Sequence, residues 1–303
     1  MTDDALAATA LDVRYADGVH AVRGVDLAVG AGRCLGLVGE SGSGKTTVVN
    51  AVLGLLPRSA RVTGSIIVDG TEVVGASGGT LHRLRGKTLG LVAQDPMASF
   101  DPLMSVAGSV AEAWRVHHER PGHDEVGRAL ERLGIDKARV RSKLRPHLWS
   151  GGMLQRAAIA AAEAHHPRVI VADEPTSALD ADRADTIVSA LRDSGSAILL
   201  VSHDLALVAR HSDQVAVMYA GEVIERGAAE QVLARPRHPY TRALLAATPR
   251  PGHGLPVALQ GAPPRLDEEP CGCAFAPRCS MASTHCRAEQ PHLVAGVSCW
   301  EAS

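Results

Sequence analysis

Short apolar runs alternate with segments of helical periodicity along most of the 303-residue chain. This alternation is typical of an α/β fold with a largely parallel sheet. Residues 11–15 and 21–29 are expected to form two strands that pair antiparallel. A helix is expected over about 45–56, where Pro57 stops it. The remaining strands are expected at 34–38, 64–68, 88–93, 168–172, 197–201 and 214–218.

The hydrophobic pattern changes twice along the chain. From about residue 95 to residue 166 it is helical throughout, which predicts a helical subdomain inserted into the sheet domain. Near Pro236 the residues Pro, His and Cys become frequent and the periodicity fades. We therefore divide the chain into a sheet domain, residues 1–235, and a small Cys-rich appendage, residues 236–303.

Composition excludes only a few classes of protein. Hydrophobic residues make up 46% and aromatic residues 3%, so the core must be largely aliphatic. The 31 Lys and Arg residues nearly balance the 33 Asp and Glu residues, which gives no global attraction to nucleic acid. Residues 1–10 do not resemble a signal peptide, and no run approaches the roughly 18 apolar residues of a membrane-spanning helix. We expect the chain to stay in the cytosol and to meet a membrane only through partners.

Gly39 begins an eight-residue match to the pattern G-x-x-x-x-G-K-S/T, placed between an apolar strand and a helix. This context predicts a phosphate-binding loop, in which glycines let backbone N–H groups converge on phosphate oxygens. We expect Lys45 to bind the β and γ phosphates and the Thr46 hydroxyl to bind Mg²⁺. The nucleotide contacts expected in this segment are Gly39, Ser41, Gly42, Ser43, Gly44, Lys45, Thr46 and Thr47.

A second candidate element is the apolar run 169–172, which ends in Asp173 and Glu174. A strand that ends in two acids is common by itself. Downstream of a phosphate loop, however, it places both carboxylates at the edge of the sheet beside the phosphates. Asp173 can then hold Mg²⁺ through water, and Glu174 can act as general base on an attacking water.

Ser150, Gly151 and Gly152 lie between these two elements, at the start of a helix expected to run to about Glu163. An isolated Ser-Gly-Gly is most often only a helix entry. Between a phosphate loop and an acidic strand end, it resembles the signature motif of ABC ATPases. Trp149 stands where that motif usually has Leu and Met153 where it usually has Gln. Neither departure removes the hydroxyl or the glycine backbone that contact phosphate.

Other landmarks of the same family follow in order. Gln94 ends the expected strand 88–93, like the glutamine of the Q-loop. Residues 177–180, ending in Asp180, resemble the D-loop, and His203 resembles the switch histidine. Tyr15 is where the family places an aromatic ring that stacks on adenine. The resemblance covers about residues 8–235.

The resemblance implies an ABC-type fold, with a mixed sheet, an antiparallel β subdomain and an inserted helical subdomain. It also implies that two such domains close head to tail around two ATP molecules. Ser150, Gly151 and Gly152 would then contact the nucleotide of the partner domain. Gln94 and His203 would sense the γ-phosphate, Gln94 would also reach Mg²⁺, and Glu174 would be the general base.

The C-terminal part carries a second resemblance. Residues 237–245 are similar to the segment that follows the ATPase core in oligopeptide, dipeptide and nickel importers, and so are the phrases at 38–44 and 217–221. The tail from Cys273 to Cys299 is similar as well. Four of its cysteines match the family's positions and can hold one metal ion or one iron–sulfur cluster. These are Cys273, Cys279, Cys286 and Cys299.

Three interpretations of these cysteines stay open: a 4Fe–4S cluster as in some members of this branch, a single Zn²⁺, or reduced thiols without metal. Cys271 does not fit the four positions, and Cys34, within an apolar run, is expected to lie in the core. Four histidines are expected to be surface or capping residues and not ligands: His147, His165, His166 and His238.

The function implied is that of the ATP-binding and hydrolysing subunit of an importer that takes up peptides across the cytoplasmic membrane. The alternative cargo is nickel or a metallophore. Expected partners are two permease subunits, a second ATPase subunit (a paralogue or another copy) and, indirectly, an extracytoplasmic solute-binding protein. A soluble ABC ATPase acting on DNA or ribosomes is less favoured, because the sequence has one cassette and no long insertion between the phosphate loop and the signature. An exporter subunit is less favoured, because many exporters fuse the ATPase to membrane helices, which this sequence does not show.

Overall fold

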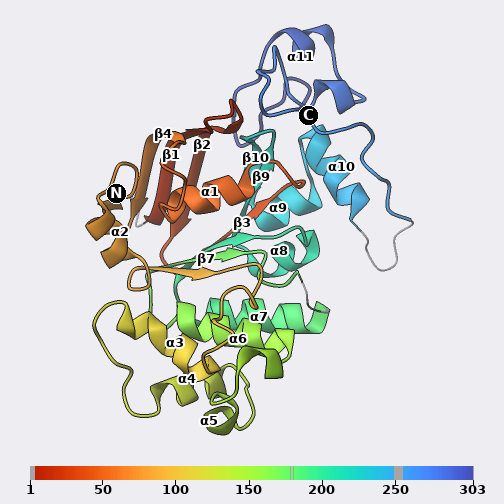
Figure 1. The fold of residues 1–303 in the computed structure, drawn as a ribbon. Coiled ribbons are helices and arrows are strands. Elements are labelled where there is room, and N and C mark those ends of the chain that lie inside the picture. Colours follow the sequence, from red (N-terminus) through yellow and green to blue (C-terminus); the bar gives the residue numbers. More distant parts are fainter. Residues whose placement is uncertain (1–3, 178, 180, 249–254, 303) are drawn as a thin grey trace.

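The computed structural model describes residues 4–177, 179, 181–248 and 255–302 (Figure 1). Their strands form two sheets. The first is antiparallel, in the order β2 (His20–Gly30), β1 (Asp4–Arg14), β4 (Arg61–Val68) and β5 (Thr71–Glu72). The second has the order β10 (Glu222–Ala228), β9 (Gln214–Tyr219), β3 (Cys34–Val38), β8 (Ala197–Val201), β7 (Val169–Asp173) and β6 (Leu89–Val92). Its pairs are parallel except β10–β9, so the expected mixed sheet with an antiparallel β subdomain is confirmed.

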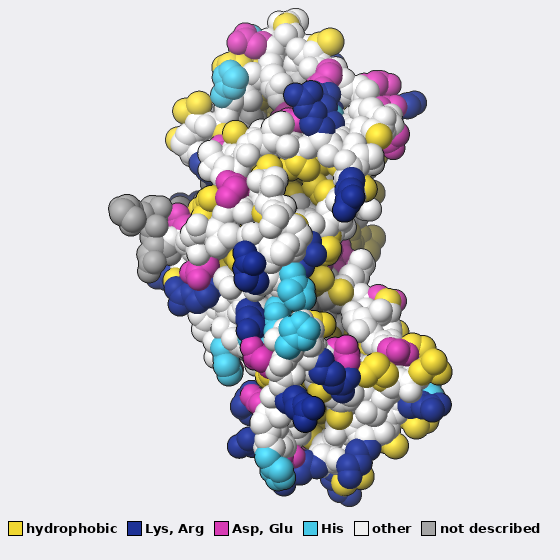
Figure 2. All heavy atoms as spheres, turned by 60° about the vertical axis from the view of Figure 1, so that its left-hand side comes forward, with side chains coloured by type: hydrophobic (Ala, Val, Ile, Leu, Met, Phe, Trp, Pro, Cys, Tyr) yellow, Lys and Arg dark blue, Asp and Glu magenta, His cyan; other side chains and the backbone are white. Residues whose placement is uncertain are grey.

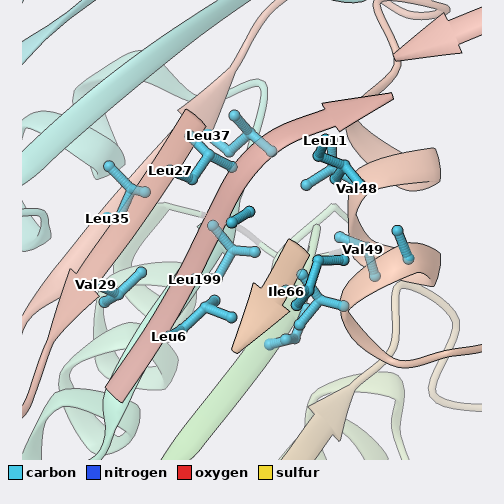
Figure 3. Packing of buried hydrophobic residues seen from close by; sticks show 14 of the residues in the cluster. Leu6, Leu11, Leu27, Val29, Leu35, Leu37, Val48, Val49, Ile66 and Leu199 are labelled. Carbon is cyan, nitrogen blue, oxygen red and sulfur yellow. The ribbon is translucent and has the colours of Figure 1, made fainter. Parts of the chain in front are cut away.

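An aliphatic core joins the two sheets to α1 (Lys45–Val52). In Figure 3, Leu11 and Ile66 of the first sheet lie beside Val48 and Val49 of the helix, and Leu37 and Leu199 of the second sheet belong to the same cluster. Every residue of β3 and β8 is buried, as expected of parallel strands that are covered on both faces. Cys34 belongs to the core on the other face of the sheet, which confirms its expected place.

The helical subdomain lies at the bottom of Figure 1. Its elements are α3 (Val106–Arg115), α4 (Glu125–Arg132), α5 (Ala138–Arg141), the short helix η1 (Pro146–Leu148) and α6 (Gly151–Ala162). Trp149 is buried in its separate core, and its indole nitrogen donates to the Arg141 carbonyl at 3.2 Å. This unusual residue therefore packs inside the subdomain.

The other helices lie around the second sheet, at the edge of the first and in the C-terminal region. They are α2 (Gly78–Leu84), α7 (Ala181–Asp193), α8 (Leu205–His211), α9 (Ala229–Ala234), α10 (Pro239–Ala247), η2 (Ala276–Arg278) and α11 (Thr284–Ala288). No helix within the described residues is long and apolar enough to cross a membrane.

Several bounds differ from the sequence-based expectation. The helix expected over 45–56 ends at Val52, because Gly54 turns the chain with a φ of 63°. The strand expected at 11–15 begins at Asp4. Its first half is rich in Ala, a residue depleted in strands, and it forms because β2 and β4 pair with it on both sides. The strands β5 and β10 were not expected.

The C-terminal region packs on the edge of the second sheet, next to β9 and β10 (Figure 1). Tyr240, Leu245 and Phe275 belong to the same core as Tyr219 of β9. His238 is buried and caps α10, with its Nδ1 accepting from the Tyr240 N–H at 3.0 Å. This bond confirms the expected capping role, and burial lowers the pKa of His238 to about 4. The division of the chain at residue 236 stays a prediction.

Candidate functional site

The loop between β3 and α1 has a conformation that requires glycine at two positions. Gly39 has a φ of 152°, and a Cβ there would collide with the Met218 carbonyl oxygen of β9. Gly44 has a φ of 105°, and a Cβ there would collide with the Ala21 carbonyl oxygen of β2. These close approaches fold the loop over the start of α1, whose free N–H groups attract anions.

Lys45, the first residue of α1, is held inside this loop. Its Nζ donates to the carbonyl oxygens of Gly39 and Glu40, both at 2.8 Å, and lies 3.4 Å from the Ser43 hydroxyl. Burial lowers the pKa of Lys45, while the nearby carboxylates of Glu174 and Asp173 act in the opposite direction. These bonds orient the ammonium group within the loop.

Three candidate residues converge at the carboxyl ends of the adjacent strands β6, β7 and β8. Glu174 Oε2 accepts from Gln94 Nε2 at 3.0 Å and lies 3.4 Å from His203 Nδ1. Glu174 has a φ of 46°, a left-handed conformation that is uncommon outside glycine and often found at functional sites. A carboxylate, an amide and an imidazole therefore share one small region.

Asp173 is the last residue of β7 and is half-buried. Burial raises its pKa, the neighbouring Glu174 carboxylate raises it further, and Lys45 lowers it. Mg²⁺ in phosphate sites is usually held by few protein oxygens, since water and the phosphates supply the remaining ligands. The Thr46 hydroxyl and the Asp173 carboxylate fit such a sparse set.

Most of the residues expected to contact the nucleotide line one cavity of about 570 Å³. This volume is within the range of small-molecule sites. At one end the Tyr15 hydroxyl lies 3.2 Å from Thr47 Oγ1. The expected residues that line the cavity are Tyr15, Gly39, Ser41, Gly42, Gly44, Lys45, Thr46, Thr47, Gln94, Glu174 and His203. Three further lining residues were not foreseen from the sequence: Val19, Ala21 and Leu266.

The signature residues lie elsewhere. Ser150 caps α6, and its hydroxyl accepts from the Met153 N–H at 3.3 Å. Ser150 and Gly152 line a second cavity of about 340 Å³ that shares no lining residue with the first. Gly151 is exposed and lines neither cavity. Asp180 lies outside the described residues.

The four matching cysteines line one narrow cavity of the C-terminal region, together with the aromatic side chains of Phe275 and Trp300. Burial raises the pKa of Cys273 to about 11 and also raises that of Cys299. Cys271 is exposed and lies outside this cavity. Within the described ranges, no group of three or more His, Cys, Asp or Glu side chains is arranged to hold a metal ion. The thiols are gathered, but their arrangement is not that of a formed metal site.

Two family models match the chain. The ABC transporter model covers residues 22–177, and the model of the oligopeptide/dipeptide transporter C-terminal region covers residues 224–286. The oligopeptide transport ATP-binding protein OppD of Haemophilus influenzae is 38% identical over 281 residues, which is 89% of this chain and 87% of that protein. OppD of Escherichia coli is 38% identical over 283 residues, 90% of this chain and 84% of that protein.

OppD of Mycobacterium tuberculosis is 41% identical over 290 residues, 92% of this chain. The match covers 47% of the mycobacterial protein, so the chain spans about half the length of that relative.

Solved structures agree on the fold. The cbiO1 protein of Clostridium perfringens, described as part of the ABC transporter complex cbiONQ, has a TM-score of 0.66 and 29% identity. That likeness covers 77% of this chain and 92% of cbiO1. The dimeric ABC transporter cassette MJ0796 has a TM-score of 0.66 at 24% identity, covers 74% of this chain and supports the fold alone. The chain therefore belongs to the ABC transporter family, in its oligopeptide/dipeptide transport ATP-binding branch.

Proposed function

We propose that this chain binds and hydrolyses ATP to drive an importer of oligopeptides or dipeptides. The main support for hydrolysis is that Gln94, Glu174 and His203 lie close together and line the same cavity as the phosphate loop. Peptide cargo is favoured over nickel or a metallophore, because the relatives above are named for oligopeptide transport and the C-terminal family model for oligopeptides and dipeptides.

In this proposal each residue has one task. Lys45 and the loop N–H groups bind the β and γ phosphates, and Tyr15 stacks on the base. Thr46 and Asp173 hold Mg²⁺, which neutralises phosphate charge. Glu174 accepts a proton from the attacking water, with Gln94 and His203 fixing its carboxylate.

Replacing Glu174 tests the hydrolysis. Glu174→Gln keeps one oxygen that can accept from Gln94, so ATP binding should persist. Turnover in the assembled transporter should fall by at least about 10²-fold, the usual scale for a lost general base. The matched control is Glu230→Gln, an exposed glutamate in the first turn of α9. Turnover of Glu174→Gln within a few-fold of the control would refute the assignment.

We further propose that a second ATPase domain completes the site. Ser150 and Gly152 line a different cavity from the phosphate loop, so one chain alone does not bring them to its own nucleotide. Head-to-tail pairing would bring each signature to the nucleotide of the other chain and make hydrolysis depend on closure. We favour a paralogous partner. The mass of the purified transporter tests this choice. A mass that fits two copies of this chain and no second ATPase would contradict a paralogous partner.

We propose that the segment after Gln94 contacts the membrane subunits. Leu103 and Met97 there are 76% and 47% exposed, which is unusual for apolar side chains of this size. We propose that this surface docks a short helix from one of two permease subunits. This contact would hold the chain at the cytoplasmic face of the membrane, and the permeases would receive substrate from an extracytoplasmic solute-binding protein. A cysteine at Ser99 should cross-link to a cytoplasmic loop of the permease. Its failure in every nucleotide state would contradict the docking surface.

Nucleic acid is not proposed as a partner. Basic and acidic side chains are intermixed on the face shown in Figure 2, and the net charge is −2. Neither feature is typical of a surface that binds phosphate backbones.

For the four gathered cysteines we propose a 4Fe–4S cluster, with Zn²⁺ or free thiols as the alternatives. Support comes from their common cavity and from the scarcity of large apolar side chains in this region, which favours a cross-link. Anaerobically purified protein should absorb broadly near about 400 nm and hold about four irons. One zinc or no metal per chain would contradict the cluster.

A further inference from the structure

Glu40, the second residue of the phosphate loop, is held by two residues from the C-terminal part of the chain. Its backbone N–H donates to the Tyr240 hydroxyl at 2.8 Å. Its carboxylate accepts two bonds from Arg278, from Nη1 to Oε2 at 2.7 Å and from Nη2 to Oε1 at 3.1 Å. A bidentate, charge-assisted pair of this kind fixes both partners in direction as well as in distance.

The pair is largely shielded from solvent. The Arg278 side chain is 5% exposed and that of Glu40 25%. The guanidinium also lies 5.8 Å from the ring centre of Tyr219 and 6.0 Å from that of Phe275, and its Nε donates to the Gln260 carbonyl at 2.9 Å. Such a pair is screened little by salt.

Glu40 in turn fixes the phosphate-binding groups. Its carbonyl oxygen accepts from Lys45 Nζ at 2.8 Å and from the Ser43 N–H at 3.2 Å. A displacement of Glu40 would therefore move both the ammonium group and a turn of the loop. Phosphate recognition depends on such placement, since small misplacements of binding groups have large effects.

Arg278 is itself anchored by its backbone. It ends the short helix η2, which lies between Cys273 and Cys279 in the chain. The Ala276 N–H donates to the Cys273 carbonyl at 2.9 Å, and the Cys279 N–H donates to the Ala276 carbonyl at 3.3 Å. Phe275, just before this helix, is buried edge-on against the ring of Tyr219. The guanidinium is thus presented from a fixed support.

We propose that Arg278 is a positioning residue for ATP binding, which holds the phosphate loop in its binding conformation through Glu40. The C-terminal region would thereby set the affinity for nucleotide, although Arg278 does not line the nucleotide cavity. This inference rests on the proposed binding of ATP at the phosphate loop.

The test is a double-mutant cycle on the purified full chain, with the Kd of Mg·ATP as readout. Arg278→Gln and Glu40→Gln should each weaken binding about tenfold, equivalent to about 1.4 kcal/mol. The double variant should bind no more weakly than either single variant, because both remove one interaction. Arg278→Lys keeps the charge but loses the bidentate fork, so it should fall between the parent and Arg278→Gln.

Arg287→Gln is the matched control, since Arg287 is an exposed arginine of the same C-terminal region. It should bind ATP like the parent. Hydrogen exchange supplies a local readout: amides 39–44 should exchange faster in Arg278→Gln, while those of β7 and β8 keep the parent's rates. In the assembled ATPase the KM for ATP should rise with kcat nearly unchanged.

Binding by Arg278→Gln within twofold of the parent would overturn the proposal. So would additive losses in the double variant, or faster exchange spread evenly over the sheet. Should Arg278→Gln not fold, Arg278→Lys and Glu40→Gln are judged by the same criteria. A parent chain that binds no Mg·ATP would instead refute the proposed function, which is measured before any variant is compared.

Discussion

Glu163 follows the last residue of α6, the helix that begins after Ser150. Its Oε1 is buried and has no hydrogen-bond partner among the described residues. Burial raises the pKa of this carboxyl to about 7; Asp193 also raises it, and Arg132 lowers it. The carbonyl end of a helix disfavours a negative charge as well. We therefore expect Glu163 to bind a proton more tightly in the folded chain than in the unfolded chain.

The sign of the effect follows from linkage. The ordinary pKa of 4.5 applies to the unfolded chain, and a value of about 7 to the folded chain. The stabilising contribution is complete below pH 4.5 and is lost as the pH rises through 7. This difference in pKa corresponds to an upper bound of about 3 kcal/mol. Because the side chain is only partly buried, screening by solvent reduces the expected loss to about 2 kcal/mol.

The measurement is the free energy of unfolding in urea at pH 5 and pH 8, for the parent and for Glu163→Gln. The amide cannot ionise, so the variant should lose about 2 kcal/mol less than the parent between the two pH values. Histidine titration affects both proteins equally and cancels in the difference. Glu230→Gln, at an exposed site, should follow the parent. Stability curves for the parent and Glu163→Gln that stay parallel across this interval would refute the reasoning.

Three further predictions concern single side chains. Leu266→Ala opens the wall of the nucleotide cavity that lies near Tyr15, so it should weaken binding of ATP about threefold to tenfold in a nucleotide titration, at the scale of a lost apolar contact. Trp149→Leu restores the usual residue of the signature but leaves a void and removes the indole bond to the Arg141 carbonyl, so it should lower the free energy of unfolding by about 2–3 kcal/mol in urea. Gly44→Ala places a methyl group against a carbonyl of β2, so calorimetric titration should detect no ATP binding while circular dichroism still reports a folded chain.

The sequence was sufficient for features that are encoded locally. The phosphate loop could be predicted because Gly39 and Gly44 occupy positions that only glycine tolerates, and Lys45 starts a helix directly after them. The convergence of Gln94, Glu174 and His203 could be expected as well, because each follows a short apolar strand and the ends of parallel strands share one edge.

Features that depend on tertiary contacts could not be predicted. The strand β10 contains two glutamates, and one of them, Glu225, is buried because its carboxylate accepts from the backbone N–H groups of Arg237 and His238. Glu40 and Arg278 are 238 positions apart, and no local sequence pattern predicts that they form a pair. Long-range polar pairs of this kind become visible only once the chain is folded.

The C-terminal region is joined at two separated points to segments that surround the nucleotide cavity, which argues against a merely peripheral role. Beside β2 the Leu266 carbonyl accepts from the His20 N–H at 2.8 Å, and Glu269 forms an ion pair with Arg23 at 2.9 Å. At the phosphate end Arg278 holds Glu40. A segment tied at two separated points resists both translation and rotation, whereas one tie would leave it free to pivot. Loosening the region should therefore disturb the base and the phosphates together, so nucleotide affinity is a more sensitive measure of its order than global stability.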